Sequence, residues 1–305
     1  MTRVIFMGTP DYAASILEAL IAADDIDVVS VYTQPDKPVG RKAILTPPAV
    51  KVIAEKANIP VIQPIKLRDE AVVNTLLSIP CDMIIVAAYG QILPKEILEY
   101  VPCVNLHASI LPHYRGASPI QQSLLNNDLE SGVSAMWMDE GLDTGAVIKI
   151  KTLPIGEDEM VESLYKRLTE SAVELTLDII RNWDRKSAMN QNNEQATNCK
   201  KILKSDGLID FRDAREIYNR YRAFTPWPGI FIESGLKIKE MKLEEVMSHG
   251  EGEAGQIIHM DKEGIVVQCS RGSLRITRVQ APSKQETSVV DYLNGKRSGC
   301  GYPLV

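Results

Sequence analysis

Short apolar runs alternate with amphipathic stretches over the first part of the chain. The runs are rich in β-branched residues, which favours buried strands, and the stretches between them repeat apolar positions at helical spacing. The predicted strands are 4–7, 28–32, 60–62, 83–88 and 103–107. The predicted helices are 11–22, 49–57 and 67–77. This alternation predicts an α/β domain with a doubly wound, mostly parallel, Rossmann-like sheet that is covered on both faces.

The pattern changes after about residue 147. A long helix is predicted over 159–183, and the polar run 190–195 that follows it is the best linker candidate. One more helix is predicted over 214–224, together with short glycine-punctuated strands at 231–233, 255–258, 265–269 and 274–279. Short strands of this kind predict a small antiparallel, OB-like β-barrel. The expected organisation is a first domain over 1–189, a linker over 190–204 and a second domain over 205–305.

The composition is that of a globular protein, with 45% hydrophobic and 24% charged residues. The 5 cysteines are odd in number and show no Cys-x-x-Cys spacing, which favours free thiols in a reducing compartment over disulfides or a zinc site. No apolar run approaches the roughly 18 residues of a transmembrane helix, so no membrane association is expected. The first residues predict a strand entering a turn rather than a signal peptide. A cytoplasmic location is therefore expected.

The charge distribution differs between the two parts of the chain. The net charge of −6 argues against general nucleic-acid binding. From Cys199 to the end, however, 17 Lys and Arg stand against 14 Asp and Glu, which leaves +3, whereas the preceding part carries 17 against 26, or −9. A mildly basic second part permits a polyanionic partner.

Two polar side chains close the predicted strand 103–107. Alternate residues of a strand face the same way, so Asn105 and His107 project side by side at the carboxyl end, where parallel sheets place their sites. The pair suits acyl transfer, because Asn can donate to an oxygen that becomes negative and His can relay the proton of a nucleophile. The competing interpretation, two polar residues satisfied by the backbone, is the commoner one for an isolated Asn-x-His.

An acidic loop further along the chain offers a third group. Residues 138–145 contain three carboxylates, those of Asp139, Glu140 and Asp143. One of them placed against His107 would orient the imidazole and stabilise its protonated form.

Both segments together resemble the signature of the folate-dependent formyltransferases. The resemblance rests on 105–120 (NLHASILPHYRGASPI) followed by 141–145 (GLDTG). It extends to 6–10 (FMGTP), 33–38 (TQPDKP), 204–210 (KSDGLID) and 222–229 (RAFTPWPG), and so covers nearly the whole chain.

This resemblance implies a catalytic set of Asn105, His107 and Asp143. It implies 10-formyltetrahydrofolate as co-substrate and formyl donor, and, as acceptor, the α-amine of methionine esterified to initiator tRNA, the substrate of translation initiation. The implied folate-binding residues are Val86, Ala88, Tyr89, Gly90, Ser109, Ile110, Leu111 and Pro112. No metal ion is expected, since the 4 histidines are scattered.

The long basic loop 37–48 reaches the acceptor end of the tRNA in relatives of this family. Here Arg41 and Lys42 are the candidates for phosphate or base contact, and Lys201 and Lys204 are further candidates near the linker. A solvated surface loop is the alternative interpretation. Nothing in the sequence suggests an exposed apolar seam, so a monomer is expected.

Four other functions stay open at this stage. A sugar-nucleotide formyltransferase of similar build is the nearest, but it has no need of a long basic loop at 37–48. A single-domain purine-pathway formyltransferase would leave the second domain without a role. A folate-dependent hydrolase, with water in place of the amine, and a non-catalytic RNA-binding protein are the more distant alternatives.

Overall fold

The computed structural model describes residues 1–40, 42–182, 187–244 and 252–304. The chain forms two compact units. The first comprises Met1–Pro119, Glu130–Ile155 and Leu164–Cys199, and the second comprises Ile120–Leu129, Gly156–Ser163 and Lys200–Val305.

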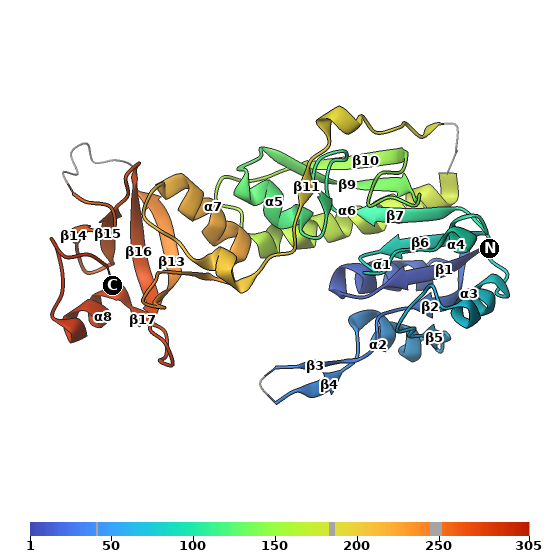
Figure 1. The fold of residues 1–305 in the computed structure, drawn as a ribbon, viewed down its shortest axis with the longest axis horizontal. Coiled ribbons are helices and arrows are strands. Elements are labelled where there is room, and N and C mark those ends of the chain that lie inside the picture. Colours follow the sequence, from blue (N-terminus) through green and yellow to red (C-terminus); the bar gives the residue numbers. More distant parts are fainter. Residues whose placement is uncertain (41, 183–186, 245–251, 305) are drawn as a thin grey trace. The chain divides into compact units, whose positions relative to one another are not determined.

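A seven-stranded sheet forms the centre of the first unit, in the order β10-β9-β7-β6-β1-β2-β5 (Figure 1). Its strands are β1 (Thr2–Gly8), β2 (Ile26–Tyr32), β5 (Val61–Ile62), β6 (Met83–Ala87), β7 (Cys103–His107), β9 (Glu130–Trp137) and β10 (Val147–Pro154). The strands from β5 to β7 are parallel, whereas β9 and β10 are antiparallel to their neighbours. The predicted mostly parallel sheet is therefore confirmed.

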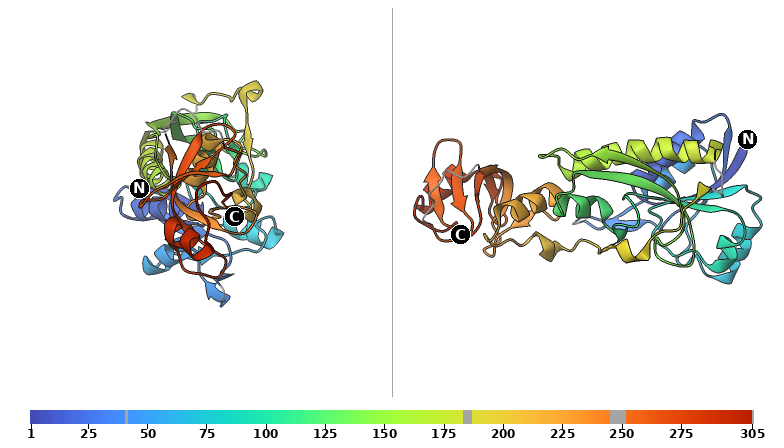
Figure 2. Two further views of the ribbon diagram at one scale, coloured as in Figure 1. Left: turned by 90° about the vertical axis from the view of Figure 1, so that its left-hand side faces the viewer. Right: turned by 90° about the horizontal axis from the view of Figure 1, so that it is seen from above.

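Helices cover both faces of this sheet. They are α1 (Asp11–Ile21), α2 (Ala49–Lys56), α3 (Glu70–Leu77), α4 (Lys95–Leu98) and the long α6 (Val161–Asn182), which runs beside the strands in Figure 2. Ile5 and Met7 of β1 share a core cluster with Leu76 of α3 and Ile97 of α4. On the opposite face, the backbone N–H of α1's Tyr12 donates to the hydroxyl of α6's Tyr165 at 2.8 Å. Alternation along β1 therefore supplies two apolar faces, as the continuous apolar run predicts.

The register of β6 and β7 brings two predicted site segments together. Val86 pairs with Asn105 in the parallel ladder, so both strands end at the same edge of the sheet. The loops that follow them are therefore neighbours in space.

The basic segment 37–48, which the sequence predicts as a long loop, contains two short paired strands. β3 (Lys37–Val39) and β4 (Ile44–Thr46) pair antiparallel, and all side chains of both strands are exposed. Because neither strand buries a face, no apolar alternation marks the hairpin in the sequence. Arg41, one of the predicted tRNA contacts, lies outside the described residues.

An antiparallel sheet forms the centre of the second unit, in the order β12-β13-β16-β15-β14, with β17 paired to β16. Its elements are α7 (Ala214–Phe224), β12 (Ile230–Phe231), β13 (Lys237–Glu244), β14 (Ile257–Met260), β15 (Ile265–Gln268), β16 (Ser273–Gln280), β17 (Thr287–Ser288) and α8 (Val289–Lys296). The predicted antiparallel sheet is confirmed. Among the described residues, however, the pairing begins at β12 and ends at β14, without a ladder between these two that would close a barrel.

None of the helices in the described ranges has the length and apolar character needed to span a membrane.

The turn between β14 and β15 carries an acidic residue whose ionisation is coupled to folding. Asp261 accepts hydrogen bonds from Arg275 Nη1 at 2.8 Å and from the backbone N–H groups of Glu263 and Gly264. These bonds, chiefly that from Arg275, lower the pKa of Asp261 to about 2. A carboxyl group whose folded pKa lies below its unfolded value of about 3.9 stabilises the fold above that pH, and this contribution is lost as the pH falls towards 2.

We expect Asp261→Asn to make the stability of the second unit less dependent on pH between about 4 and 2. Calorimetric unfolding at a series of pH values measures this. Glu263→Gln, which removes an exposed carboxylate two residues away, is the matched control and should keep the wild-type slope. An unchanged slope in Asp261→Asn would contradict the prediction.

Candidate active site

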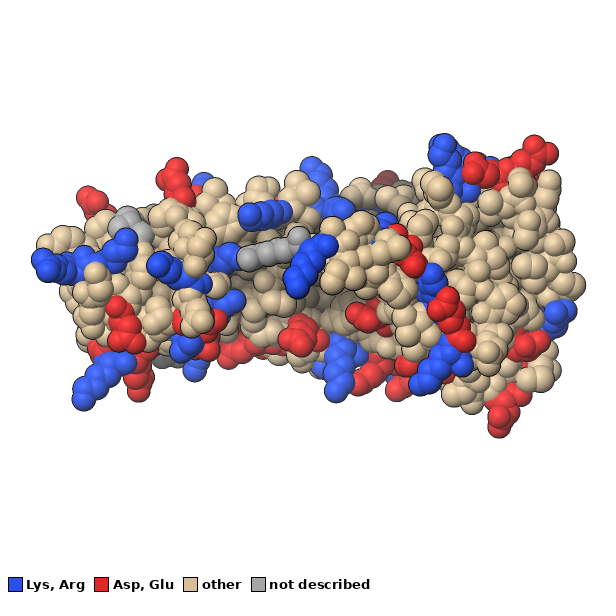
Figure 3. Space-filling view, turned by 90° about the horizontal axis from the view of Figure 1, so that it is seen from below, with Lys and Arg blue, Asp and Glu red and all other residues tan. Residues whose placement is uncertain are grey.

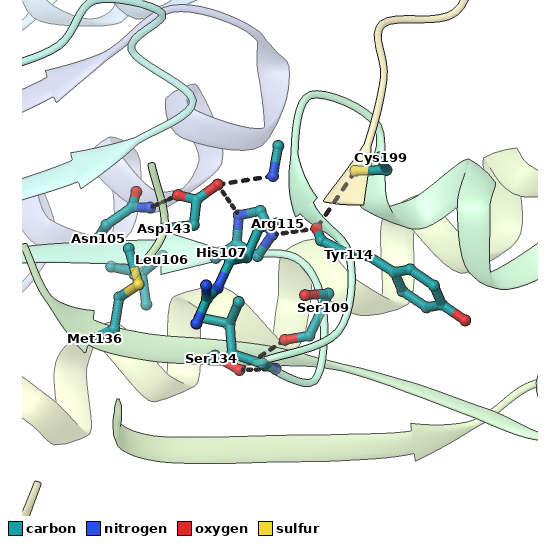
Figure 4. A network of polar contacts seen from close by, with 12 residues as sticks. Asn105, Leu106, His107, Ser109, Tyr114, Arg115, Ser134, Met136, Asp143 and Cys199 are labelled. Carbon is teal, nitrogen blue, oxygen red and sulfur yellow. Dashed lines mark hydrogen bonds and ion pairs between the residues drawn. The ribbon is translucent and has the colours of Figure 1, made fainter. Parts of the chain in front are cut away.

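The three predicted catalytic residues lie together at the carboxyl end of β7 (Figure 4). Asn105 and His107 project from the same side of the strand, and Asp143 comes from the loop between β9 and β10. Asn105 Nδ2 donates to Asp143 Oδ1 at 3.3 Å, and His107 Nδ1 lies 3.7 Å from Asp143 Oδ2. The side chains of His107 and Asp143 are 8% and 11% exposed, so a polar cluster is held close to the interior.

The His107 ring is oriented from both sides. Its Nε2 lies 2.9 Å from the backbone oxygen of Tyr114. A carbonyl oxygen only accepts hydrogen bonds, so Nε2 carries a proton and donates it. The Nδ1 edge then faces Asp143, and a proton that arrives at Nδ1 meets a carboxylate.

The Asp143 carboxylate is the centre of the cluster. Besides the amide of Asn105, it accepts the backbone N–H of Gly116 at 2.8 Å on Oδ2. Hydrogen bonds to an ionised acceptor are stronger than those between neutral groups, so these donors hold the carboxylate in place between Asn105 and His107.

Gly116 brings this N–H to Asp143 through an unusual backbone conformation. Its φ is +118°, and a Cβ placed on it would lie 2.4 Å from the backbone oxygen of Cys199. β8 (Arg115–Gly116) pairs in parallel with β11 (Asn198–Cys199), which explains the close approach. Only glycine satisfies both conditions.

The roles of Arg115 and Gln191 in the site were not expected from the sequence. The guanidinium of Arg115 is buried and donates to the side-chain oxygens of Gln191 and Asn193. Gln191 in turn donates to the backbone oxygens of Asp143 and Gly145. Gln191 lies in the polar run predicted as a linker, and no sequence signal separates it from its polar neighbours.

The predicted folate-binding residues divide into a buried and an accessible group. The buried ones are Val86, Tyr89, Ser109 and Leu111. The accessible ones are Ala88, Gly90, Ile110 and Pro112, of which Ala88 and Gly90 have positive φ values of 47° and 83°. The loop's shape comes from its buried part, since Ser109 Oγ donates to the backbone oxygen of His113 at 2.6 Å.

Buried Tyr89 supports the loop after β6. Its backbone oxygen accepts from Thr9 Oγ1 and Gln34 Nε2, each at 3.1 Å, which ties the loops after three neighbouring strands together. Burial, with a smaller contribution from Tyr32, raises the pKa of the Tyr89 hydroxyl well above its usual value, so it stays neutral.

The predicted tRNA-binding lysines are all exposed. Lys42 lies in the β3–β4 hairpin of the first unit, and Lys201 and Lys204 lie at the start of the second. Figure 3 shows basic and acidic side chains interspersed over each unit on the face drawn. Within the described ranges, no three or more His, Cys, Asp or Glu side chains gather into a group that could hold a metal ion.

Family comparisons agree with this two-part architecture. The formyl transferase model matches residues 2–180, and the model of the formyl transferase C-terminal domain matches residues 201–297. The chain is therefore of the formyl transferase class.

Relatives at high sequence identity show which formyltransferase family the chain belongs to. The methionyl-tRNA formyltransferase of Sulfurimonas denitrificans is 55% identical over 295 residues, 97% of each chain, and that of Wolinella succinogenes is 48% identical over 303 residues, 99% of each chain. The chain belongs to the methionyl-tRNA formyltransferase family.

Solved structures share the fold at lower identity. The N-formyltransferase from Helicobacter canadensis has a TM-score of 0.66 at 20% identity, covering 94% of this chain and all of its own. HypX from Aquifex aeolicus has a TM-score of 0.62 at 16% identity, and 99% of this chain matches 49% of HypX.

Proposed function

We propose that the protein transfers the formyl group of 10-formyltetrahydrofolate to the α-amine of methionine on initiator tRNA, for translation initiation. The convergence of Asn105, His107 and Asp143 at the end of β7 carries the proposal. Its specificity for methionyl-tRNA rests on relatives of that name at up to 55% identity over almost the full length.

Asn105 is assigned to the formyl oxygen. A side-chain amide has two N–H bonds, and the contact with Asp143 uses one. The other can donate to the formyl oxygen as the amine attacks the formyl carbon and the carbonyl electrons move to that oxygen. The new C–N bond to the methionine forms before the bond to the folate nitrogen breaks and its electron pair leaves with that nitrogen.

His107 and Asp143 are assigned to the protons. The attacking amine loses a proton and the departing folate nitrogen gains one, and the Nδ1 edge of His107 beside Asp143 can hold a proton between these steps. The 3.7 Å separation is beyond hydrogen-bond distance, but such contacts often tighten only when substrate is bound.

The accessible half of the predicted folate residues fits a flat heteroaromatic ligand. Ala88 and Gly90 are exposed and lie just after the end of β6, which pairs with the strand that carries Asn105. Their positive φ values turn the main chain there. Ile110 and Pro112 add partly exposed apolar surface. Main-chain polar groups beside apolar surface are typical of sites for such ligands. Val86, Tyr89, Ser109 and Leu111 would support this surface from behind.

We assign formyl transfer to the predicted domain over 1–189 and tRNA binding to the predicted domain over 205–305. Of the predicted linker 190–204, the residues up to Cys199 belong to the first unit. Arg41, Lys42, Lys201 and Lys204 are the proposed tRNA contacts. Because protein synthesis takes place in the cytoplasm, we propose that the protein acts there. We also propose that it is a monomer.

Replacing Lys201 and Lys204 together by Ala is expected to weaken tRNA binding and flatten its salt dependence. If each lysine neutralises one phosphate, the slope of log K against log[salt] becomes less negative by about 1.4 to 1.8. Filter binding between 50 and 200 mM salt measures this, with KM for the folate unchanged. The double variant of Lys237 and Lys262, two other exposed lysines of the second unit, is the control. Equal slopes in the two double variants would refute the assignment.

One assay separates the proposed function from its alternatives. The protein is incubated with 10-formyltetrahydrofolate and either methionyl initiator tRNA, an amino-sugar nucleotide or buffer alone. Formylated methionyl-tRNA is the expected product. Transfer only to the sugar, release only of formate, or binding of tRNA without turnover would each overturn the proposal in favour of one alternative.

A further inference from the structure

The polar segment 189–199, which we name the strap, is joined to the first unit along its length. At one end, the backbones of Met189 and Val147 exchange two hydrogen bonds of 2.8 Å. Towards the other end, the N–H of Arg115 donates to the backbone oxygen of Thr197, and β11 pairs with β8. The strap therefore contacts both the loop that carries Asp143, at its Val147 end, and the segment Arg115–Gly116.

Gln191 is the residue at which these two loops meet. Its Oε1 accepts from Arg115 Nε at 3.0 Å and from Arg115 Nη2 at 2.7 Å. Its Nε2 donates to the backbone oxygens of Asp143 at 2.9 Å and Gly145 at 2.8 Å. Two donated and two accepted bonds use the full capacity of a side-chain amide.

The turn that Gln191 holds is the one that presents Asp143. Asp143 has a φ of +54°, in the left-handed region that is unfavourable for residues other than glycine. The conformation persists only if its surroundings determine it, and the two bonds from Gln191 to the carbonyls on either side of Thr144 do so.

The other side of Gln191 leads to His107. Arg115, its partner, lies between Tyr114, whose oxygen accepts from His107 Nε2, and Gly116, whose N–H binds the Asp143 carboxylate. The buried guanidinium also polarises the Gln191 amide, which strengthens the bonds that the amide donates.

We propose that Gln191 is a positioning residue for formyl transfer, because it sets the Asp143 loop against the Arg115–Gly116 segment and so fixes the carboxylate relative to His107. The effect on catalysis rests on the proposed function, whereas the effect on geometry does not. A glutamate at this position would keep the contact with Arg115 but would turn oxygens towards two carbonyl oxygens, so an amide is required.

Gln191→Leu and Gln191→Glu are expected to lower kcat by about 10- to 100-fold, as is typical of residues that orient a catalytic group, with KM for both substrates within about threefold of wild type. Gln195→Leu and Gln195→Glu are matched controls on the strap, since no side-chain hydrogen bond of Gln195 is found within the described ranges. They should retain wild-type kcat. Gln191→Asn, one methylene shorter, replaces either variant that fails to fold.

A double-variant cycle tests whether Gln191 acts through Asp143. In the Asp143→Asn background, adding Gln191→Leu should change kcat by less than about twofold, because the interaction it supports is already lost. A loss that adds in full to that of Asp143→Asn, or a wild-type kcat in Gln191→Leu alone, would overturn the proposal.

Amide hydrogen exchange separates the failure of this inference from the failure of the proposed function. The Gly116 N–H should exchange faster in Gln191→Leu than in wild type and Gln195→Leu, because its acceptor Asp143 is displaced. Unchanged exchange at Gly116 would overturn the positioning role even if formylation is observed. Faster exchange in a protein that formylates no methionyl-tRNA would support the positioning role and sink only the proposed function.

Discussion

Asp143→Asn is expected to lower kcat for the formylation of methionyl-tRNA by about four orders of magnitude, comparable to the loss of the orienting carboxylate in other His-carboxylate sites. The carboxylate now faces three nitrogen groups, those of Asn105, His107 and Gly116. The amide of Asn has only one oxygen that can accept hydrogen bonds from these groups. Its NH₂ group would therefore face at least one of the other nitrogen groups. The positive charge of a protonated His107 also loses its partner.

Single-turnover kinetics with methionyl-tRNA and the formyl donor measures this loss at the chemical step. The KM of both substrates should stay near wild type, because Asn and Asp have nearly the same shape. Glu140→Gln makes the same chemical change on an exposed carboxylate of the same loop and should leave kcat unchanged. Wild-type kcat in Asp143→Asn would remove this residue from the mechanism.

Gly116→Ala is expected to lower the free energy of unfolding of the first unit by about 2 to 5 kcal/mol, the sum of a strained backbone and an overpacked contact. The new Cβ would lie 2.4 Å from the oxygen of Cys199, and backbone on both sides leaves no flexible group to move away. A φ of +118° is unfavourable for alanine even without this clash. Because separation of β8 from β11 would also move the N–H that binds Asp143, kcat should fall as well.

Denaturant unfolding with circular dichroism measures the stability change. Gly295→Ala is the matched control, since Gly295 is exposed in helix α8 and its added Cβ would have nothing within 4 Å apart from its chain neighbours and the backbone of its own helix. Helix propensity predicts that this variant is stabilised by about 0.5 to 1 kcal/mol. Equal stability of Gly116→Ala and wild type would show that the β8–β11 contact opens at little cost.

Apolar periodicity predicted many of the elements that bury a face and missed those that do not. It also missed the buried strand β9, in which Ser and Gly interrupt the apolar residues. β7 and α7 have the predicted bounds, because each combines a clear apolar pattern with a marked end. The β3–β4 hairpin is exposed on both strands, and β13 places Lys and Glu between its buried residues, so neither shows an apolar run. Periodicity reports burial, and exposed or highly charged strands escape it.

The linker prediction shows the same limit for polar residues. Residues 190–195 are rich in Asn and Gln, which is typical of a solvated connection. In the structure, Gln191 and Asn193 instead bond to the buried Arg115. Composition records that these side chains need hydrogen bonds and does not record whether water or protein supplies them.

The sequence by itself determined the α/β class, the position of Asn105 and His107 at a strand end, and the family signature that adds Asp143. Only the tertiary structure decided which atoms meet: Nδ1 of His107 faces the carboxylate, Gly116 completes its hydrogen bonds, and Gln191 holds its loop. The physical reason is separation along the chain. Strand periodicity acts over neighbouring residues, whereas these contacts join segments 27 to 48 residues apart and exist only once the sheet and the strap are in place.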